Sequence, residues 1–176
     1  VSMTTSVESL FGSGRAVGGF MLNNQLTDFS YVAEVDGVPV ANAVAPGKRP
    51  RSSMSPVIVL DQKGQLVAAL GSPGGSAILA YNAKALVGLL AWELPLQQAI
   101  DLPNVYARGE NFYGERTKFS VEVLQGLEAR GVTIEAGRGE RSGLHGLIRT
   151  EPGRYVGAAD PRREGIWRTA GPDSKY

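Results

Sequence analysis

The clearest hydrophobic pattern in the chain is a pair of short apolar runs, residues 57–60 (VIVL) and 66–70 (LVAAL), separated by residues 61–64 (DQKG). Apolar runs on either side of a polar, glycine-containing turn predict two adjacent antiparallel strands. The second run leads through residues 71–75 (GSPGG) into an apolar helical pattern over residues 76–94. Backbone N–H groups at such a helix start can hold an anion or a developing oxyanion, although Ser, Pro and Gly are also ordinary turn residues.

The rest of the chain mixes strand-like and helix-like patterns without strict alternation. Strands come in pairs and helices gather in the middle, which is typical of an α+β fold with helices packed on an antiparallel sheet. We expect strands over 1–8, 17–22, 132–135, 144–149 and 155–159, the last two forming a hairpin across residues 151–153. Helices are expected over 96–100 and 121–130, an irregular segment over 104–114 and a long surface loop over 31–51.

Composition limits the classes of protein that need be considered. A chain of 176 residues with 43% hydrophobic and 20% charged residues is expected to form a single domain over residues 1–176. The net charge of +1 gives no reason to expect a nucleic acid partner. The absence of cysteine excludes disulfides, Cys-ligated zinc and a thiol nucleophile. No apolar run is long enough for a membrane span, and no basic-then-apolar leader opens the chain.

The common catalytic signatures are missing. His145 is the only histidine and has no G-x-S-x-G motif near it, so it is interpreted as a structural residue. One histidine and no cysteine argue against a transition-metal site. The GSPGGS turn lacks the lysine of a P-loop, and Gly12-Ser13-Gly14 lacks the third glycine of a dinucleotide fingerprint. We therefore expect neither a metal nor a cofactor.

Four segments in one order give a more specific indication. They are 22–30 (LNNQLTDFS), 48–56 (KRPRSSMSP), 71–76 (GSPGGS) and 160–162 (DPR). Together they closely resemble the γ-glutamyltransferase (γ-glutamyltranspeptidase) family, and the resemblance extends from about Thr4 to Arg162.

The resemblance implies an N-terminal-nucleophile hydrolase fold, an αββα sandwich, made by a precursor that cleaves itself. The small subunit then begins with a Thr nucleophile whose own α-amino group can act as base. This chain resembles most of a small subunit without its N-terminal nucleophile strand, and Thr4 and Thr5 do not match the nucleophile. The implied partner is the large subunit of the same precursor, and the chain alone is expected to be inactive.

The resemblance also carries roles over to four residues of the two polar segments. Gln25 and Asp28 match positions that hold the α-amino group of the substrate, and a carboxylate such as that of Asp28 can pair with an ammonium. Ser52 and Ser53 match the hydroxyls that bind the substrate α-carboxylate.

Gly74 and Gly75 match the oxyanion hole, in agreement with the turn chemistry described above. Three matched positions differ from the family pattern. Ser6 stands where a Thr beside the nucleophile is common, and Glu8 stands where many members have an Asn that helps to hold the α-amino group. Arg51 replaces the apolar residue that is usual before the serine pair.

The implied activity is acyl transfer or hydrolysis of γ-glutamyl amides such as glutathione, acting on a small-molecule or peptide substrate. Two alternatives stay open. One is a related acylase for a cephalosporin side chain or poly-γ-glutamate, which Glu8 and Arg51 favour. The other is a non-catalytic fragment that binds an anion or a partner chain. Family members are usually exported, so a periplasmic or extracellular location is expected.

Overall fold

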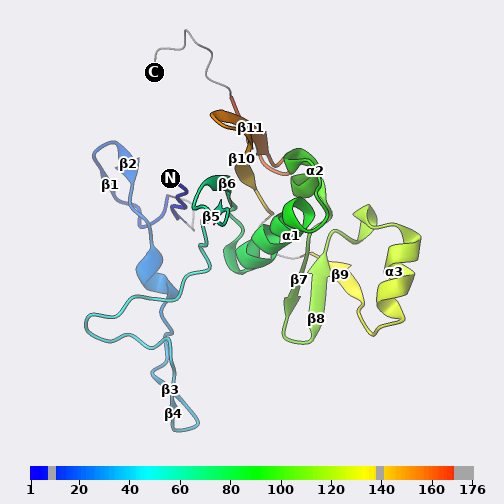
Figure 1. Ribbon diagram of the computed structural model, residues 1–176. Helices are drawn as coiled ribbons and strands as arrows, with labels where there is room; N and C mark the ends of the chain where they lie inside the picture. Colours follow the sequence, from blue (N-terminus) through cyan, green and yellow to red (C-terminus); the bar gives the residue numbers. More distant parts are fainter. Residues whose placement is uncertain (8–10, 138–140, 169–176) are drawn as a thin grey trace. The chain divides into compact units, whose positions relative to one another are not determined.

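The computed structural model of the protein describes residues 1–7, 11–137 and 141–168. The chain divides into two compact units: Val1–Thr4 with Met54–Tyr176, called here the sheet unit, and Thr5–Ser53, called the loop unit. Figure 1 shows that the labelled α-helices and the longer strands belong to the sheet unit. The single domain predicted from length and composition stays a prediction.

The sheet unit is built on an antiparallel sheet with the order β11-β10-β6-β5 among the described residues. Its strands are β5 (Val57–Leu60), β6 (Leu66–Gly71), β10 (His145–Glu151) and β11 (Arg154–Ala159). The predicted hairpin of β5 and β6 is confirmed, with Ile58 opposite Ala69. Asp61 closes its turn, because its Oδ1 accepts hydrogen bonds from the backbone N–H groups of Lys63 and Gln65, both at 2.9 Å.

Two helices lie against this sheet. They are α1 (Ile78–Leu90), which follows the 3₁₀ turn η2 (Gly75–Ala77), and α2 (Leu96–Asp101). The helices approach closely at Gly88, where an added Cβ would lie 2.9 Å from the Leu102 side chain. Residues of both helices, of β6 and of β11 contribute to the main apolar core, which includes Leu70, Tyr81, Ala85, Leu96, Ala99 and Ile100.

The helix predicted over 76–94 ends earlier than expected. The backbone N–H of Trp92 donates to the Val87 carbonyl, and that of Leu94 donates to the Gly88 carbonyl. Glu93 takes a φ of 53°, so the chain leaves the helix through a left-handed residue before it reaches Pro95. The predicted end at the proline was therefore wrong by one turn.

A second sheet of the sheet unit has the order β7-β8-β9 among the described residues. Its strands are β7 (Val105–Arg108), β8 (Asn111–Gly114) and β9 (Ile134–Ala136); η3 (Arg116–Lys118) and α3 (Val121–Glu128) lie between β8 and β9. The irregular segment predicted over 104–114 is a hairpin, because Gly109 with a φ of 60° closes a tight turn. β8 and β9 pair in parallel across the α3 connection, which the antiparallel expectation missed.

The described residues of the loop unit form short regular elements. They are the hairpins β1 (Ala16–Val17) with β2 (Phe20–Met21) and β3 (Glu34–Val35) with β4 (Val38–Pro39), and the 3₁₀ helix η1 (Gln25–Asp28). The predicted strand over 1–8 is not formed in residues 1–7, where no ladder partner supports it. In the described part of the chain, no helix combines the length and the apolar character that a membrane crossing requires.

Candidate functional site

The 3₁₀ helix η1 places the first pair of predicted site residues side by side. Its start is set by Asn23, whose Oδ1 accepts a hydrogen bond from the backbone N–H of Gln25 at 3.0 Å. Because Gln25 and Asp28 are three residues apart, one turn brings their side chains together. Gln25 Nε2 donates to Asp28 Oδ2 at 2.5 Å, which orients the carboxylate.

Asn42, in the loop after β4, connects η1 to the segment that precedes the serine pair. Its Nδ2 donates to the Asp28 carbonyl at 2.6 Å, and its Oδ1 accepts from the Arg51 backbone N–H at 2.9 Å. Gln25 Nε2 makes a second, longer contact of 3.4 Å with the Arg51 carbonyl. These bonds fix Asp28 beside the backbone that continues into Ser52. Asn42 lies in a loop without periodicity, so no sequence pattern points to it.

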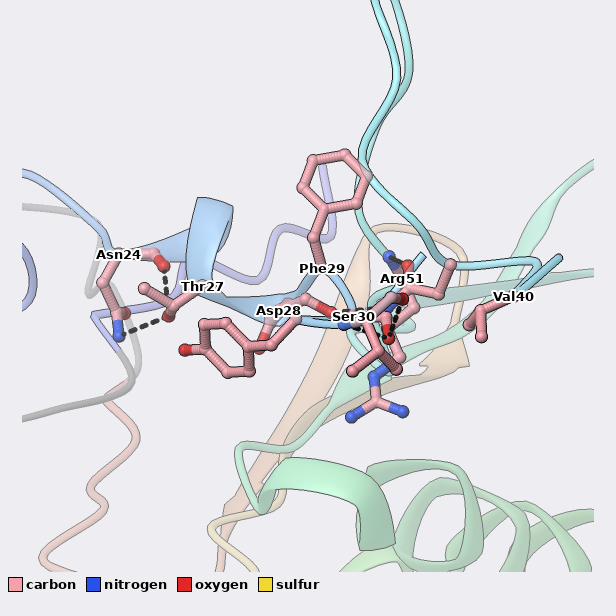
Figure 2. A pocket seen from close by; sticks show the side chains of 10 residues that line it. Asn24, Thr27, Asp28, Phe29, Ser30, Val40 and Arg51 are labelled. Atoms are coloured by element: carbon pink, nitrogen blue, oxygen red, sulfur yellow. Dashed lines mark hydrogen bonds between the residues drawn. The ribbon is translucent and has the colours of Figure 1, made fainter. Parts of the chain in front are cut away.

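Asp28, Asn42 and Arg51 line a hollow of about 850 Å³ in the loop unit (Figure 2). Asn24 and Thr27 add polar groups, and Phe29, Tyr31, Val32 and Val40 add apolar surface. Asn24 Oδ1 is a buried acceptor without a hydrogen-bond partner among the described residues. A hollow of this size with apolar walls and a few polar groups is typical of small-ligand sites.

The other predicted residues of the loop unit are placed less fully. Ser52 is exposed and Ser53 is half-buried, directly after the anchored Arg51. Ser6 is half-buried in a stretch without regular secondary structure. Glu8 lies outside the described residues. The binding roles of Ser6, Ser52 and Ser53 therefore stay predictions.

The glycine turn, residues 71–75, leads from β6 into η2 and α1 in the sheet unit. Gly74 has a φ of 140° and Gly75 a φ of 54°, both in the region that favours glycine. A Cβ on Gly74 would lie 2.5 Å from Cε2 of Tyr81. Backbone N–H groups exposed in a tight turn can bind an anion. The predicted oxyanion role of both glycines stays a prediction.

A buried serine fastens this turn to a distant loop. Ser72 is 2% exposed, and its Oγ donates to the Pro73 carbonyl at 2.6 Å while it accepts from the Gly143 N–H at 3.1 Å. Next to Gly143, the fully buried Ser142 donates to Asp160 Oδ2 at 2.5 Å. His145, the only histidine, contacts the Gly143 carbonyl through Nδ1 at 2.8 Å, in keeping with a structural role.

Asp160, Arg162 and Glu115 form a buried ionic cluster, called here the Arg162 cluster. The Arg162 guanidinium, 5% exposed, makes two bonds to Glu115 of 2.8 and 2.7 Å and one to Asp160 of 3.1 Å. Burial by itself would raise the pKa of Glu115, but hydrogen bonds from Arg162, Lys118 and the Asn104 backbone outweigh it and lower that pKa to about 2. For Asp160, too, burial is outweighed by hydrogen bonds from Ser142 and Arg162, so its pKa is lowered.

The Arg162 cluster therefore explains the third of the DPR residues as a structural one. Arg162 also donates to the carbonyls of Ile100, Asp101 and Leu102 at the end of α2. Across the described ranges, no three His, Asp or Glu side chains gather in a way that could hold a metal ion. What the geometry offers is an oriented carboxylate in a hollow and, in the other unit, a rigidly held glycine turn.

Comparison with known proteins gives the family. The chain is 34% identical over 170 residues to the glutathione hydrolase proenzyme of Bacillus subtilis strain 168, and 37% identical over 173 residues to that of Escherichia coli strain K12. These matches cover 94% and 92% of this chain but 28% and 29% of the relatives. The chain thus spans less than a third of the length of these relatives.

A solved structure agrees with this result. A highly active mutant of gamma-glutamyltranspeptidase from Pseudomonas nitroreducens has a TM-score of 0.78 and 33% identity, over 98% of this chain and 93% of that chain. This likeness confirms the predicted α+β fold of the N-terminal-nucleophile hydrolase class. Residues 1–169 match the family described as gamma-glutamyltranspeptidase. The chain belongs to the gamma-glutamyltranspeptidase family.

Proposed function

We propose that the protein transfers or hydrolyses γ-glutamyl amides such as glutathione, and that this chain contributes binding and oxyanion residues to an autoprocessed enzyme. The observation that carries the proposal is the set of hydrogen bonds that Gln25 and Asn42 make, in which Asn42 donates to Asp28 and accepts from Arg51. They hold the Asp28 carboxylate at a hollow, beside the backbone that leads into Ser52 and Ser53. A γ-glutamyl group carries an ammonium and a carboxylate on one carbon, so it needs an acceptor group and a donor group close together.

Each charged group of the γ-glutamyl head then has a partner in the loop unit. The ammonium pairs with Asp28, and the unpartnered Asn24 Oδ1 supplies a further acceptor on the wall of the same hollow. The hydroxyls of Ser52 and Ser53 donate to the α-carboxylate. Bonds between charged and polar groups of this kind contribute about 1.5–3 kcal/mol each.

The acyl step uses the glycine turn. The hydroxyl of a Thr expected upstream of this chain attacks the γ-carbonyl carbon, and its proton passes by way of the Thr α-amino group to the leaving amine. An ester forms as the amide C–N bond breaks, and the N–H groups of Gly74 and Gly75 stabilise the intermediate oxyanion, each donor contributing about 2.7–4 kcal/mol. Water or a second amine then takes the acyl group from the ester.

The proposed partner is the large subunit of the same precursor. The support is that the curated relatives are named proenzymes and that this chain spans less than a third of their length. N-terminal sequencing and intact mass of the native protein test this point. We expect a small subunit that begins with Thr upstream of Val1 and a larger subunit that co-purifies. Native material that begins at Val1 without a partner contradicts the proposal. The periplasmic or extracellular location stays a prediction, which cell fractionation checks.

The binding role of Asp28 is tested by Asp28→Asn in the intact protein, which removes the charge and keeps the shape. We expect kcat/KM for a γ-glutamyl anilide to fall about ten- to a hundredfold, because a charge-assisted pair is lost. The preference for this donor over the glutaryl anilide, which lacks the α-amino group, falls by the same factor. The control is Asp36→Asn, an exposed residue of the β3–β4 turn. An unchanged rate at low donor concentration in Asp28→Asn rejects the assignment.

A further inference from the structure

Arg51 places a cation in the same hollow as the Asp28 carboxylate. Both side chains line it, from segments 23 residues apart that Asn42 holds together (Figure 2). The backbone of Arg51 is fixed on both sides, since its N–H donates to Asn42 and its carbonyl accepts from Gln25. The guanidinium therefore starts from an anchored point.

The Arg51 guanidinium differs from those of three arginines that form ion pairs within the fold. Arg149 pairs with Asp61, Arg116 with Glu128, and Arg162 with Glu115 and Asp160. Arg51 is exposed and makes no ion pair with any described residue. An arginine fork matches a carboxylate in geometry, and it is weakly hydrated compared with an ammonium.

We propose that Arg51 forms a subsite for a second carboxylate of the substrate, so that the enzyme prefers acidic γ-glutamyl peptides to neutral ones. The inference rests on the proposed function, in which Asp28 takes the α-ammonium and the serine pair takes the α-carboxylate. Once those two groups are bound, the Arg51 cation remains for an anion further along the substrate.

The rest of the hollow agrees with a peptide of this kind. Its volume of about 850 Å³ lies within the range of small-ligand sites. Phe29, Tyr31, Val32 and Val40 supply apolar surface against which the methylene groups of a glutamyl chain can pack. The hollow thus combines one anion, one cation and an apolar wall, which is complementary to an ammonium, a carboxylate and an aliphatic stem.

The test compares two nearly isosteric substrates, γ-glutamylglutamate and γ-glutamylglutamine, with the intact enzyme. They differ by one carboxylate in the leaving group. We expect kcat/KM to be about tenfold higher for the acidic peptide, mainly because its KM is lower. A factor of about ten corresponds to the lower end of the free energy of a hydrogen bond to a charged group. The preference weakens as ionic strength rises. Arg51→Gln abolishes the preference, and Arg51→Lys retains part of it.

The matched control is Arg49→Gln, which removes an arginine two residues away that does not line the hollow. This variant keeps the wild-type preference. Two results overturn the inference while the proposed function stands: a wild type that cleaves both peptides equally well, or an Arg51→Gln variant that keeps the preference or loses both activities in equal proportion. A wild type that cleaves neither peptide nor the γ-glutamyl anilide overturns the proposed function itself.

Discussion

Replacing Arg162 by methionine removes the cation of the Arg162 cluster and nearly preserves its volume. The carboxylates of Asp160 and Glu115 then lose the cation that both contact. Water can replace this partner only in part, because Asp160 is fully buried and the Glu115 side chain is 25% exposed. Breaking a buried ion pair from one side typically costs about 3–5 kcal/mol, because the other charge stays buried without compensation. We expect a loss of free energy of unfolding of that order at pH 7.

The pKa of Glu115 gives a second estimate of how much the Arg162 cluster contributes to the free energy of unfolding. It lies at about 2, against an ordinary value of 4.5, which corresponds to about 3 kcal/mol at 1.36 kcal/mol per unit. Because the folded-state pKa is lowered, this stabilisation is complete above the unfolded value and is lost as pH falls from about 4.5 to about 2. Among the groups that lower this pKa, Arg162 has the largest effect, ahead of Lys118 and the Asn104 backbone, so the Arg162→Met variant loses less stability than the wild type over this interval.

Urea unfolding of the intact protein at a series of pH values measures both effects. The control is Arg154→Met, which removes an ion pair with Glu151 whose side chains are 72% and 67% exposed. Such surface pairs contribute less than about 1 kcal/mol. The reasoning is refuted if Arg162→Met and Arg154→Met unfold at the same urea concentration at pH 7. It is also refuted if the difference in free energy of unfolding between Arg162→Met and the wild type does not become smaller as pH falls below 4.5.

Two further changes probe the site. In Gly74→Ala, the added Cβ would clash with the Tyr81 ring, and the φ of 140° at this position is unfavourable for alanine. We expect kcat to fall about a hundredfold or more, because the N–H that donates to the oxyanion is displaced. Gly64→Ala, at a left-handed position with open space, is its control, and equal kcat values in the two variants contradict the assignment. Asn42→Ala releases the Asp28 carbonyl and the Arg51 N–H, and steady-state kinetics should show a KM for the donor raised about tenfold; an unchanged KM argues against Asn42 as a positioning residue.

The hydrophobic pattern predicted local pairs better than distant ones. The β5–β6 and β10–β11 hairpins were expected because alternation and turn residues lie within a few positions of each other. The pairing of β6 with β10 joins segments about 75 residues apart, and neither run carries a signal for the other. The parallel pair of β8 and β9 was missed for the same reason. The β7–β8 hairpin was missed because the turn at Gly109 was interpreted as part of an irregular segment.

The site residues also differ in whether nearby sequence reveals their role. Gln25 and Asp28 share one turn of η1, so their spacing was informative, and Gly74 and Gly75 occupy backbone conformations that explain their glycines. Asn42 has no local signal, because its role exists only through contacts with two other segments. Ser72 was interpreted as a turn residue, and its bond to Gly143 could not be inferred from a motif.

The bond between Ser72 and Gly143 also has a consequence for the order of events during synthesis. The two residues are 71 positions apart, and the loop at Gly143 is itself held through Ser142 by Asp160. A ribosome adds about 5–20 residues per second, so the glycine turn leaves the exit tunnel on the order of ten seconds before the residues that fix it. Closing such a long loop is also entropically costly until β10 has paired with β6. A nascent chain therefore acquires this turn late, after most of its helices have been made.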